Sequence, residues 1–209
     1  MLEPMQAYAR WAPRYPACPH NLLMTLEQAA VLALLPAQID SAADLACGTG
    51  RYARLLHDRH ARGVLALDAS PDMLQQAAGA PARLVRGDLR AIPLASASFD
   101  VAVCGLAIGD VPDLTLVVAE FARVLRPGGC VVYSDLHPRG ARAGWARTFE
   151  DAAGDGWTVR QHIHDLSDHA HACRSAGLVI DAVGEPAIDV EHPYRGWPAA
   201  LVVRARRLS

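Results

Sequence analysis

The heptad DLACGTG at residues 44–50 constrains the fold of this chain more than any other stretch. The apolar residues that lead into it predict a buried strand, and residues 51–61 predict a helix with one apolar side. A glycine-rich turn between strand and helix lets a ligand approach the main chain, because no side chain stands in the way. The following helix offers free N–H groups at its N-terminus. The heptad therefore predicts an α/β fold with a ligand site at this turn.

Two nucleotide-binding patterns compete for the turn, and neither fits fully. A phosphate loop needs G-x-x-x-x-G-K-[ST], and no lysine is present here. A dinucleotide site needs G-x-G-x-x-G, but Ala53 takes the place of the third glycine after Gly48 and Gly50. Asp44 would repel a pyrophosphate and would instead accept a hydrogen bond from an ammonium group, directly or through water. A turn that only connects strand and helix is the alternative.

A second strand, residues 64–67, ends in Asp68, 18 residues after Gly50. In dinucleotide-type folds an acid about 20 residues beyond the glycine turn binds the ribose diol. Helices alternating with short apolar strands predict right-handed crossovers and a mainly parallel sheet. The further predicted elements are a helix at 71–79, strands at 82–86 and 99–106, a helix at 114–125 and a strand at 130–134.

Five segments, in order, resemble motifs of one family, the Rossmann-like class of S-adenosylmethionine-dependent methyltransferases. They are DLACGTG, ALDAS (66–70), GDLRAIPL (87–94), SFDVAVCGLAIGDVPD (98–113) and RVLRPGG (123–129). The resemblance covers about residues 44–135, and Ala46 departs from it where many members have glycine. Within the family, the chain looks most like the broad group of quinone-pathway and carrier-protein-linked malonyl methyltransferases. The resemblance implies S-adenosyl-L-methionine as cofactor and S-adenosyl-L-homocysteine as product.

The resemblance also implies which residues contact the cofactor. Three strand-end acids carry polar contacts: Asp44 to the methionine moiety, Asp68 to the ribose and Asp88 to the adenine amino group. The turn and neighbouring apolar residues complete the set: Ala46, Cys47, Gly48 and Gly50 at the methionine moiety, Ala69, Met73 and Leu89 at the adenine, and Leu106 between cofactor and acceptor. For Met73 and Leu89, ordinary core packing is the alternative.

The resemblance implies a single α/β domain with a seven-stranded, mostly parallel Rossmann-like sheet and helices on both faces. Its last strand would run antiparallel between the fifth and sixth. We expect an N-terminal cap and helix (1–37), a cofactor-binding core (38–136), a lid insertion (137–164) and a C-terminal helix with strands (165–209). The prolines among residues 1–21 predict irregular backbone in the cap, and residues 140–156 predict a short helix and turn.

Composition agrees with a soluble enzyme. With 209 residues, 52% of them hydrophobic, the chain can bury one sizeable core. A net charge of −2 predicts no nucleic-acid partner. No apolar run reaches the ~20 residues of a membrane span, and no basic-then-apolar signal pattern opens the chain. Five cysteines without a C-x-x-C pair predict reduced thiols and a cytoplasmic setting.

Histidines and aromatic residues outside the core are the candidates for the acceptor site. His137 follows the predicted fifth strand, where ligands of open α/β sheets bind, and is a candidate general base. A loop histidine bonded to nearby backbone is the alternative. Tyr15, His20 and His164 are candidates for substrate binding. The later histidines lack a recognisable ligand set, so no metal is expected.

The predicted function is S-adenosylmethionine-dependent methyl transfer to a small-molecule acceptor at oxygen, nitrogen, sulfur or an activated carbon. No membrane partner is expected. A protein of the same fold that binds the cofactor without transferring methyl, in a regulatory or assembly role, is the alternative. The two would differ in turnover with a labelled methyl donor.

Overall fold

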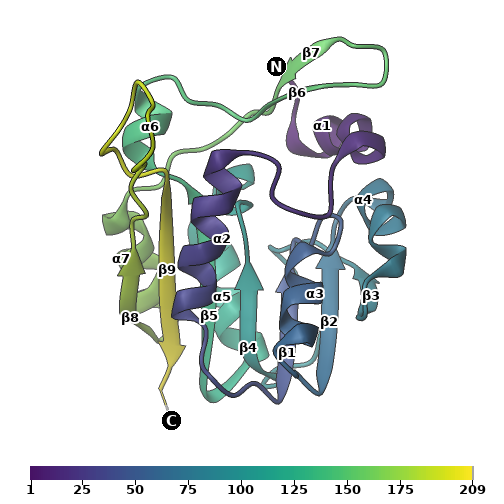
Figure 1. Cartoon of the computed structure of the whole chain (residues 1–209). Helices are drawn as coiled ribbons and strands as arrows, with labels where there is room; N and C mark the ends of the chain where they lie inside the picture. Colours follow the sequence, from purple (N-terminus) through teal and green to yellow (C-terminus); the bar gives the residue numbers. More distant parts are fainter. Residues whose placement is uncertain (209) are drawn as a thin grey trace.

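The computed structural model describes residues 1–208 and is built around a seven-stranded sheet in the order β3-β2-β1-β4-β5-β9-β8 (Figure 1). β9 runs antiparallel to both of its neighbours, and the other strands are parallel to one another. The expected topology is thereby confirmed. The strands are β1 (Ser41–Leu45), β2 (Gly63–Asp68), β3 (Arg83–Arg86), β4 (Phe99–Cys104), β5 (Leu125–Leu136), β8 (Leu178–Gly184) and β9 (Ala200–Arg207).

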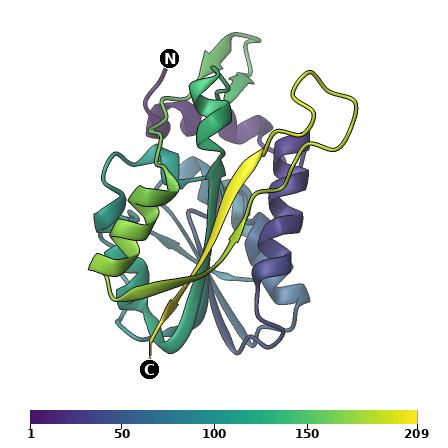
Figure 2. The same cartoon turned by 90° about the vertical axis from the view of Figure 1, so that its left-hand side faces the viewer.

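Helices cover both faces of the sheet because each central strand is apolar on both sides (Figures 1 and 2). In β5, Tyr133 packs with the buried side chains of α5 and α7, while Val132 packs with those of α2 and α3. The helices that flank the sheet are α2 (Leu22–Leu34), α3 (Arg51–Asp58), α4 (Pro71–Gln76), α5 (Leu114–Val124) and α7 (Leu166–Ser175).

The parallel register brings the ends of β1, β2 and β4 to one edge of the sheet. Asp44 near the end of β1 pairs with Ala66 of β2 and Val103 of β4. Asp68 ends β2 beside Arg86 of β3. Strand-end acids that lie far apart in the sequence are therefore neighbours at this carboxyl edge, where ligands of open α/β sheets bind.

A cap covers the carboxyl edge, formed by α1 (Pro4–Trp11) and the hairpin of β6 (Thr148–Glu150) and β7 (Gly156–Thr158) (Figure 1). Leu2 pairs with Val159, and the Trp11 ring stacks on Phe149 at 4.7 Å. The cap thus joins the two segments that the sequence predicts as N-terminal cap and lid.

Two expectations about these segments are wrong in detail. Irregular backbone was expected over residues 1–21, but Pro4–Trp11 is helical, because Pro4 lies in the first turn, where its missing N–H costs nothing. The remaining prolines follow this helix. A short helix and turn were expected at 140–156, but α6 (Pro138–Arg142) is followed by a β-hairpin. Asp151 organises its turn by accepting from the N–H groups of Ala153 and Asp155.

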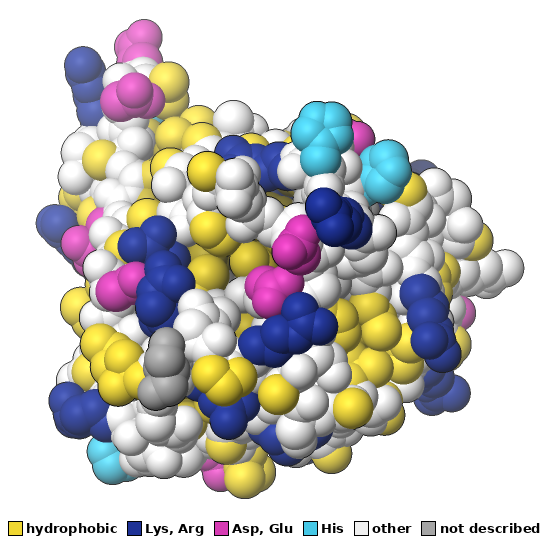
Figure 3. All heavy atoms as spheres, turned by 90° about the horizontal axis from the view of Figure 1, so that it is seen from below, with side chains coloured by type: hydrophobic (Ala, Val, Ile, Leu, Met, Phe, Trp, Pro, Cys, Tyr) yellow, Lys and Arg dark blue, Asp and Glu magenta, His cyan; other side chains and the backbone are white. Residues whose placement is uncertain are grey.

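Among residues 1–208, basic, acidic and apolar side chains are interspersed over the face opposite the cap (Figure 3). Arg126 and Asp100, for example, form an ion pair of 3.0 Å at the amino end of β4. Among residues 1–208, no helix has the length and apolar character needed to cross a membrane.

Candidate active site

A cavity of about 620 Å³ lies between the carboxyl edge of the sheet and the cap. This volume lies within the range of pockets that enclose small ligands, about 300–1,000 Å³. The glycine turn, the ends of β2 and β3, and the segment after β4 line it on the sheet side, and α1 lines it on the cap side. The cavity therefore extends from the glycine turn to the underside of the cap.

The glycine turn leaves free volume in the cavity wall. Gly48 lines the cavity with a φ of 54°, and a Cβ at this position would meet no protein atom within 4 Å. Gly50 has a φ of 83° and begins α3 without a capping side chain, and a Cβ there would lie 2.9 Å from that of Ala80. Both positions favour glycine, because their backbone is left-handed and a side chain there would be strained.

Asp44 supports this turn from below. Its side chain is buried, and Oδ2 accepts a hydrogen bond of 2.8 Å from the N–H of Ala53 in the first turn of α3. Burial raises the pKa of Asp44 to about 7, against the lowering effects of the Ala53 N–H and of Arg51. Asp44 and Cys47 lie behind the wall that Ala46 and Gly48 form. Asp44 therefore acts on the site through the turn in this structure.

Asp68 lies in the cavity wall and joins two turns. One carboxylate oxygen accepts from the N–H of Gly48 at 2.7 Å and the other from the N–H of Ser70 at 2.8 Å. Burial raises the pKa of Asp68, and these two N–H groups oppose the rise. Each oxygen keeps a lone pair for a ligand hydroxyl, as the predicted ribose contact requires.

Asp88 also lines the cavity, but Arg90 already engages its carboxylate. Arg90 Nε lies 3.0 Å from Asp88 Oδ1, and the hydrogen bonds from this side chain lower the pKa of Asp88. An adenine amino group at Asp88 would have to share the carboxylate with Arg90. Apolar surface from the other predicted residues completes this end of the cavity: Ala69, Met73 and Leu89.

A buried polar cluster, formed by Tyr8, Asp110 and Arg147, lies where the cap meets the sheet. Arg147 Nη1 donates to the Tyr8 hydroxyl at 2.8 Å, and Arg147 Nη2 lies 2.7 Å from Asp110 Oδ1 without the alignment of a hydrogen bond. The side chains of Arg147 and Asp110 are only 9% and 14% exposed. Burial raises the pKa of Asp110 to about 6, although Arg147 opposes the shift. Tyr8 and Asp110 both line the cavity.

The predicted acceptor-site residues are only partly brought together. Tyr15 lines the cavity, and burial raises its pKa. His20 packs edge-on against the Tyr15 ring at 5.5 Å and does not line the cavity. His137 does not line it either, which corrects the expected placement. Its Nδ1 accepts from the N–H of Arg139 at the start of α6, and its Nε2 lies 3.0 Å from Glu185.

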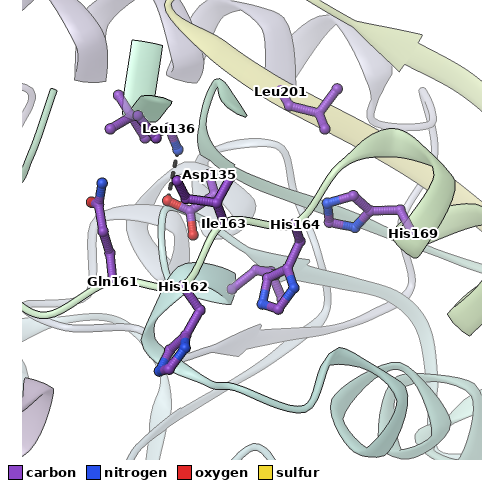
Figure 4. A pocket seen from close by; sticks show the side chains of 10 residues that line it. Asp135, Leu136, Gln161, His162, Ile163, His164, His169 and Leu201 are labelled. Atoms are coloured by element: carbon purple, nitrogen blue, oxygen red, sulfur yellow. Dashed lines mark hydrogen bonds between the residues drawn. The ribbon is translucent and has the colours of Figure 1, made fainter. Parts of the chain in front are cut away.

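His164 belongs to a separate cavity of about 10 Å³, roughly the space of one water molecule (Figure 4). Its Nε2 lies 3.0 Å from the carbonyl oxygen of Val111. His169 lines the same cavity, and burial lowers its pKa to about 4. No three His, Cys, Asp or Glu side chains within residues 1–208 are grouped as metal ligands.

Three residues of the site were not identified from the sequence: Asp110, Arg147 and His162. Asp110 lies in the segment after the fourth strand. An acid in a loop at the carboxyl edge of the sheet indicates a candidate ligand contact. His162, which lines both cavities, and Arg147 lie in the insertion after β5. Nothing local in the sequence marks these two, because their contacts are made with α1 and the loop after β4.

Comparisons with known proteins agree with this arrangement. Residues 43–133 match a family described as "Methyltransferase domain". A malonyl-[acyl-carrier protein] O-methyltransferase of Salmonella typhimurium is 33% identical over 205 residues, which cover 97% of this chain and 71% of that protein. The protein of the same name from Enterobacter lignolyticus is 38% identical over 133 residues, 62% of this chain and 52% of the relative. The chain thus spans about half the length of some curated relatives that it matches.

Among solved structures, the chain is similar to an S-adenosylmethionine dependent methyltransferase from Mesorhizobium loti. The TM-score is 0.71 with 29% sequence identity, and the match covers 87% of this chain and 98% of the other. The similarity therefore extends beyond the matched domain to most of the fold described above.

Proposed function

Because the chain belongs to the Rossmann-like family of S-adenosylmethionine-dependent methyltransferases, we propose that it transfers a methyl group to an acceptor bound beneath its cap. The observation that carries the proposal is the single cavity shared by the glycine turn, Asp68 and the acceptor-side residues Tyr8 and Asp110. The free volume at Gly48 and the open lone pairs of Asp68 fit the methionine and ribose ends of the cofactor.

S-adenosylmethionine supplies an electrophilic methyl group, so the protein has to bind, align and, where needed, deprotonate the nucleophile. We assign the cofactor contacts to the cavity-lining residues Ala46, Gly48, Asp68, Ala69, Met73, Asp88, Leu89 and Leu106, with Asp44, Cys47 and Gly50 shaping the turn behind them. Tyr15 and Tyr8 face the acceptor from the cap side.

We assign the general base to Asp110 in place of His137. Asp110 lines the cavity, and its pKa of about 6 suits proton uptake near neutral pH. Arg147 stays charged beside it, so protonation of Asp110 leaves the cluster with one positive charge and no unpaired carboxylate. The base acts where the acceptor nucleophile carries a proton, as in hydroxyls, amines, thiols and activated carbon acids.

We expect His137→Ala to leave methyl transfer unchanged within about twofold. The imidazole caps α6 outside the cavity, and loss of such a cap costs about 0.5–2 kcal/mol of stability. Thermal unfolding and turnover measured on the same preparation check this expectation. A fall of turnover by about 10²-fold or more, the size of a lost general base, would return His137 to the catalytic role.

The proposal is tested with S-adenosylmethionine carrying a labelled methyl group and a panel of acceptors. Free small molecules with hydroxyl, amine, thiol or acidic carbon groups form one arm. A malonyl thioester forms the other, because the Salmonella and Enterobacter relatives are named for malonyl bound to a carrier protein. Label transfer in either arm supports the proposal and selects the acceptor class. Cofactor binding without transfer in both arms would favour the role without turnover.

A further inference from the structure

The residue that follows β4 by two positions, Leu106, has an unusual backbone. Its φ is 57°, in the left-handed region that non-glycine residues rarely adopt. Four non-glycine residues among those described share a positive φ, and two of these, Ala46 and Leu106, line the large cavity. Such conformations persist only where the surroundings hold them, and they concentrate at functional sites.

Both peptide groups of Leu106 are held by side chains. Its N–H donates to Ser134 Oγ at 3.0 Å and also reaches the Ser134 carbonyl oxygen at 3.0 Å. Its carbonyl oxygen accepts from Arg147 Nη1 at 2.9 Å. Since Arg147 also binds Tyr8, the position of this peptide is tied to the acceptor side of the cavity.

Ser134 is in turn fixed by a buried carboxylate. Its hydroxyl donates to Glu27 Oε1 at 2.5 Å, and the Tyr52 hydroxyl donates to the same oxygen at 2.8 Å. Arg51 pairs with the second oxygen of Glu27 at 3.0 Å. Glu27 has no exposed surface, and a buried carboxylate is stable only when it is paired and hydrogen-bonded in this way.

Close packing leaves the peptide before Leu106 little room to move. A Cβ at Gly105 would lie 2.2 Å from Tyr52 Cε2 and 3.1 Å from Glu27 Oε1. The Glu27 network therefore meets the cavity wall at Gly105 through packing and at Leu106 through Ser134. Neither Glu27 nor Ser134 lines the cavity.

We propose that Glu27 and Ser134 are positioning residues for methyl transfer, which hold Leu106 in its left-handed conformation at the boundary between cofactor and acceptor. This inference rests on the proposed function. In this proposal, the buried ion pair of Glu27 and Arg51 between α2 and α3 shapes the cavity wall. The Glu27 carboxylate orients the Ser134 hydroxyl so that its oxygen accepts the Leu106 N–H.

The test compares Ser134→Ala with Ser41→Ala. Ser41 is a matched control, since its hydroxyl donates to Asp100 at 2.7 Å and accepts from the Asp100 N–H at 3.1 Å, but at the amino end of β1. We expect Ser134→Ala to lower kcat about tenfold or more through misplacement of the wall, with KM and the Kd for S-adenosylhomocysteine unchanged within about twofold. Ser41→Ala should lower the melting temperature without changing kcat.

Backbone ¹³C chemical shifts of Leu106 give a readout that does not depend on turnover. In Ser134→Ala they should move away from left-handed values, and in Ser41→Ala they should stay in place. Unchanged shifts and kcat in Ser134→Ala would overturn the proposal, as would moved shifts with full kcat. If the unaltered protein transfers no methyl group, the proposed function itself is wrong. This outcome differs from failure of the positioning proposal, in which the unaltered protein is active and Ser134→Ala behaves like it.

Discussion

Asp110→Asn is expected to lower methyl transfer by about 10²–10⁴-fold, the usual contribution of a general base. Asparagine keeps the size of the side chain but cannot accept a proton from the acceptor. It also leaves Arg147 buried without its carboxylate partner, so a lower melting temperature is expected as well. Turnover with a labelled methyl donor and an acceptor that carries a proton on its nucleophile measures the effect.

The pH profile separates the role of a base from a purely structural one. Burial raises the pKa of Asp110 to about 6, so the carboxylate is ionised above this value and protonated below it. Turnover should rise with pH through about 6 and level off above, and this rise should be absent in Asp110→Asn.

Asp151→Asn is the matched control, because Asp151 holds the cap through Trp157 Nε1 at 2.8 Å but does not line the cavity. Its pH profile should be that of the unaltered protein. An Asp110→Asn variant that keeps the rise near pH 6 would contradict the assignment of the general base to Asp110.

Asp68→Ala is expected to weaken the binding of S-adenosylhomocysteine by about 1–3 kcal/mol, roughly 5–150-fold in Kd. The substitution removes the acceptor for ligand hydroxyls. It also removes the acceptor for the N–H groups of Gly48 and Ser70, which donate hydrogen bonds to the Asp68 carboxylate. The glycine turn therefore loses part of its order. Calorimetric titration of both proteins under the same conditions measures the change.

Asp40→Ala serves as the control for this variant. Asp40 also lies next to a sheet strand, but at the amino end of β1, with a side chain that is 75% exposed and pairs with Arg62 at 3.5 Å. Its replacement should leave the affinity unchanged. Equal affinities of Asp68→Ala and the unaltered protein would remove Asp68 from the ribose contact.

The core of the fold follows from local sequence signals. β1 and β8 coincide with the apolar runs 41–45 and 178–184, because turn residues delimit both runs in the sequence. The glycines at 48 and 50 predict the ligand-approach turn, since only glycine is unstrained at both left-handed positions. Parallel pairing then places Asp44 and Asp68 at the same edge.

The cap and the acceptor side depend on contacts between distant segments, which no local pattern encodes. Arg147 binds Tyr8 across 139 positions of sequence, and Leu2 pairs with Val159. His137 illustrates the reverse case. Its place after β5 is as expected, but its Nδ1 accepts a hydrogen bond from the N–H of Arg139 in the helix that begins at Pro138. The side chain is therefore held outside the cavity.

The cavity is expected to bind S-adenosylmethionine and its product, and one calorimetric titration tests this binding most directly. Purified protein is titrated with S-adenosylhomocysteine and, separately, with reduced nicotinamide dinucleotides. We predict saturable binding of S-adenosylhomocysteine at one site per chain and no heat from the dinucleotides, because Asp44 and Ala53 depart from a pyrophosphate site. Absence of S-adenosylhomocysteine binding, or binding of a dinucleotide in its place, would contradict the account.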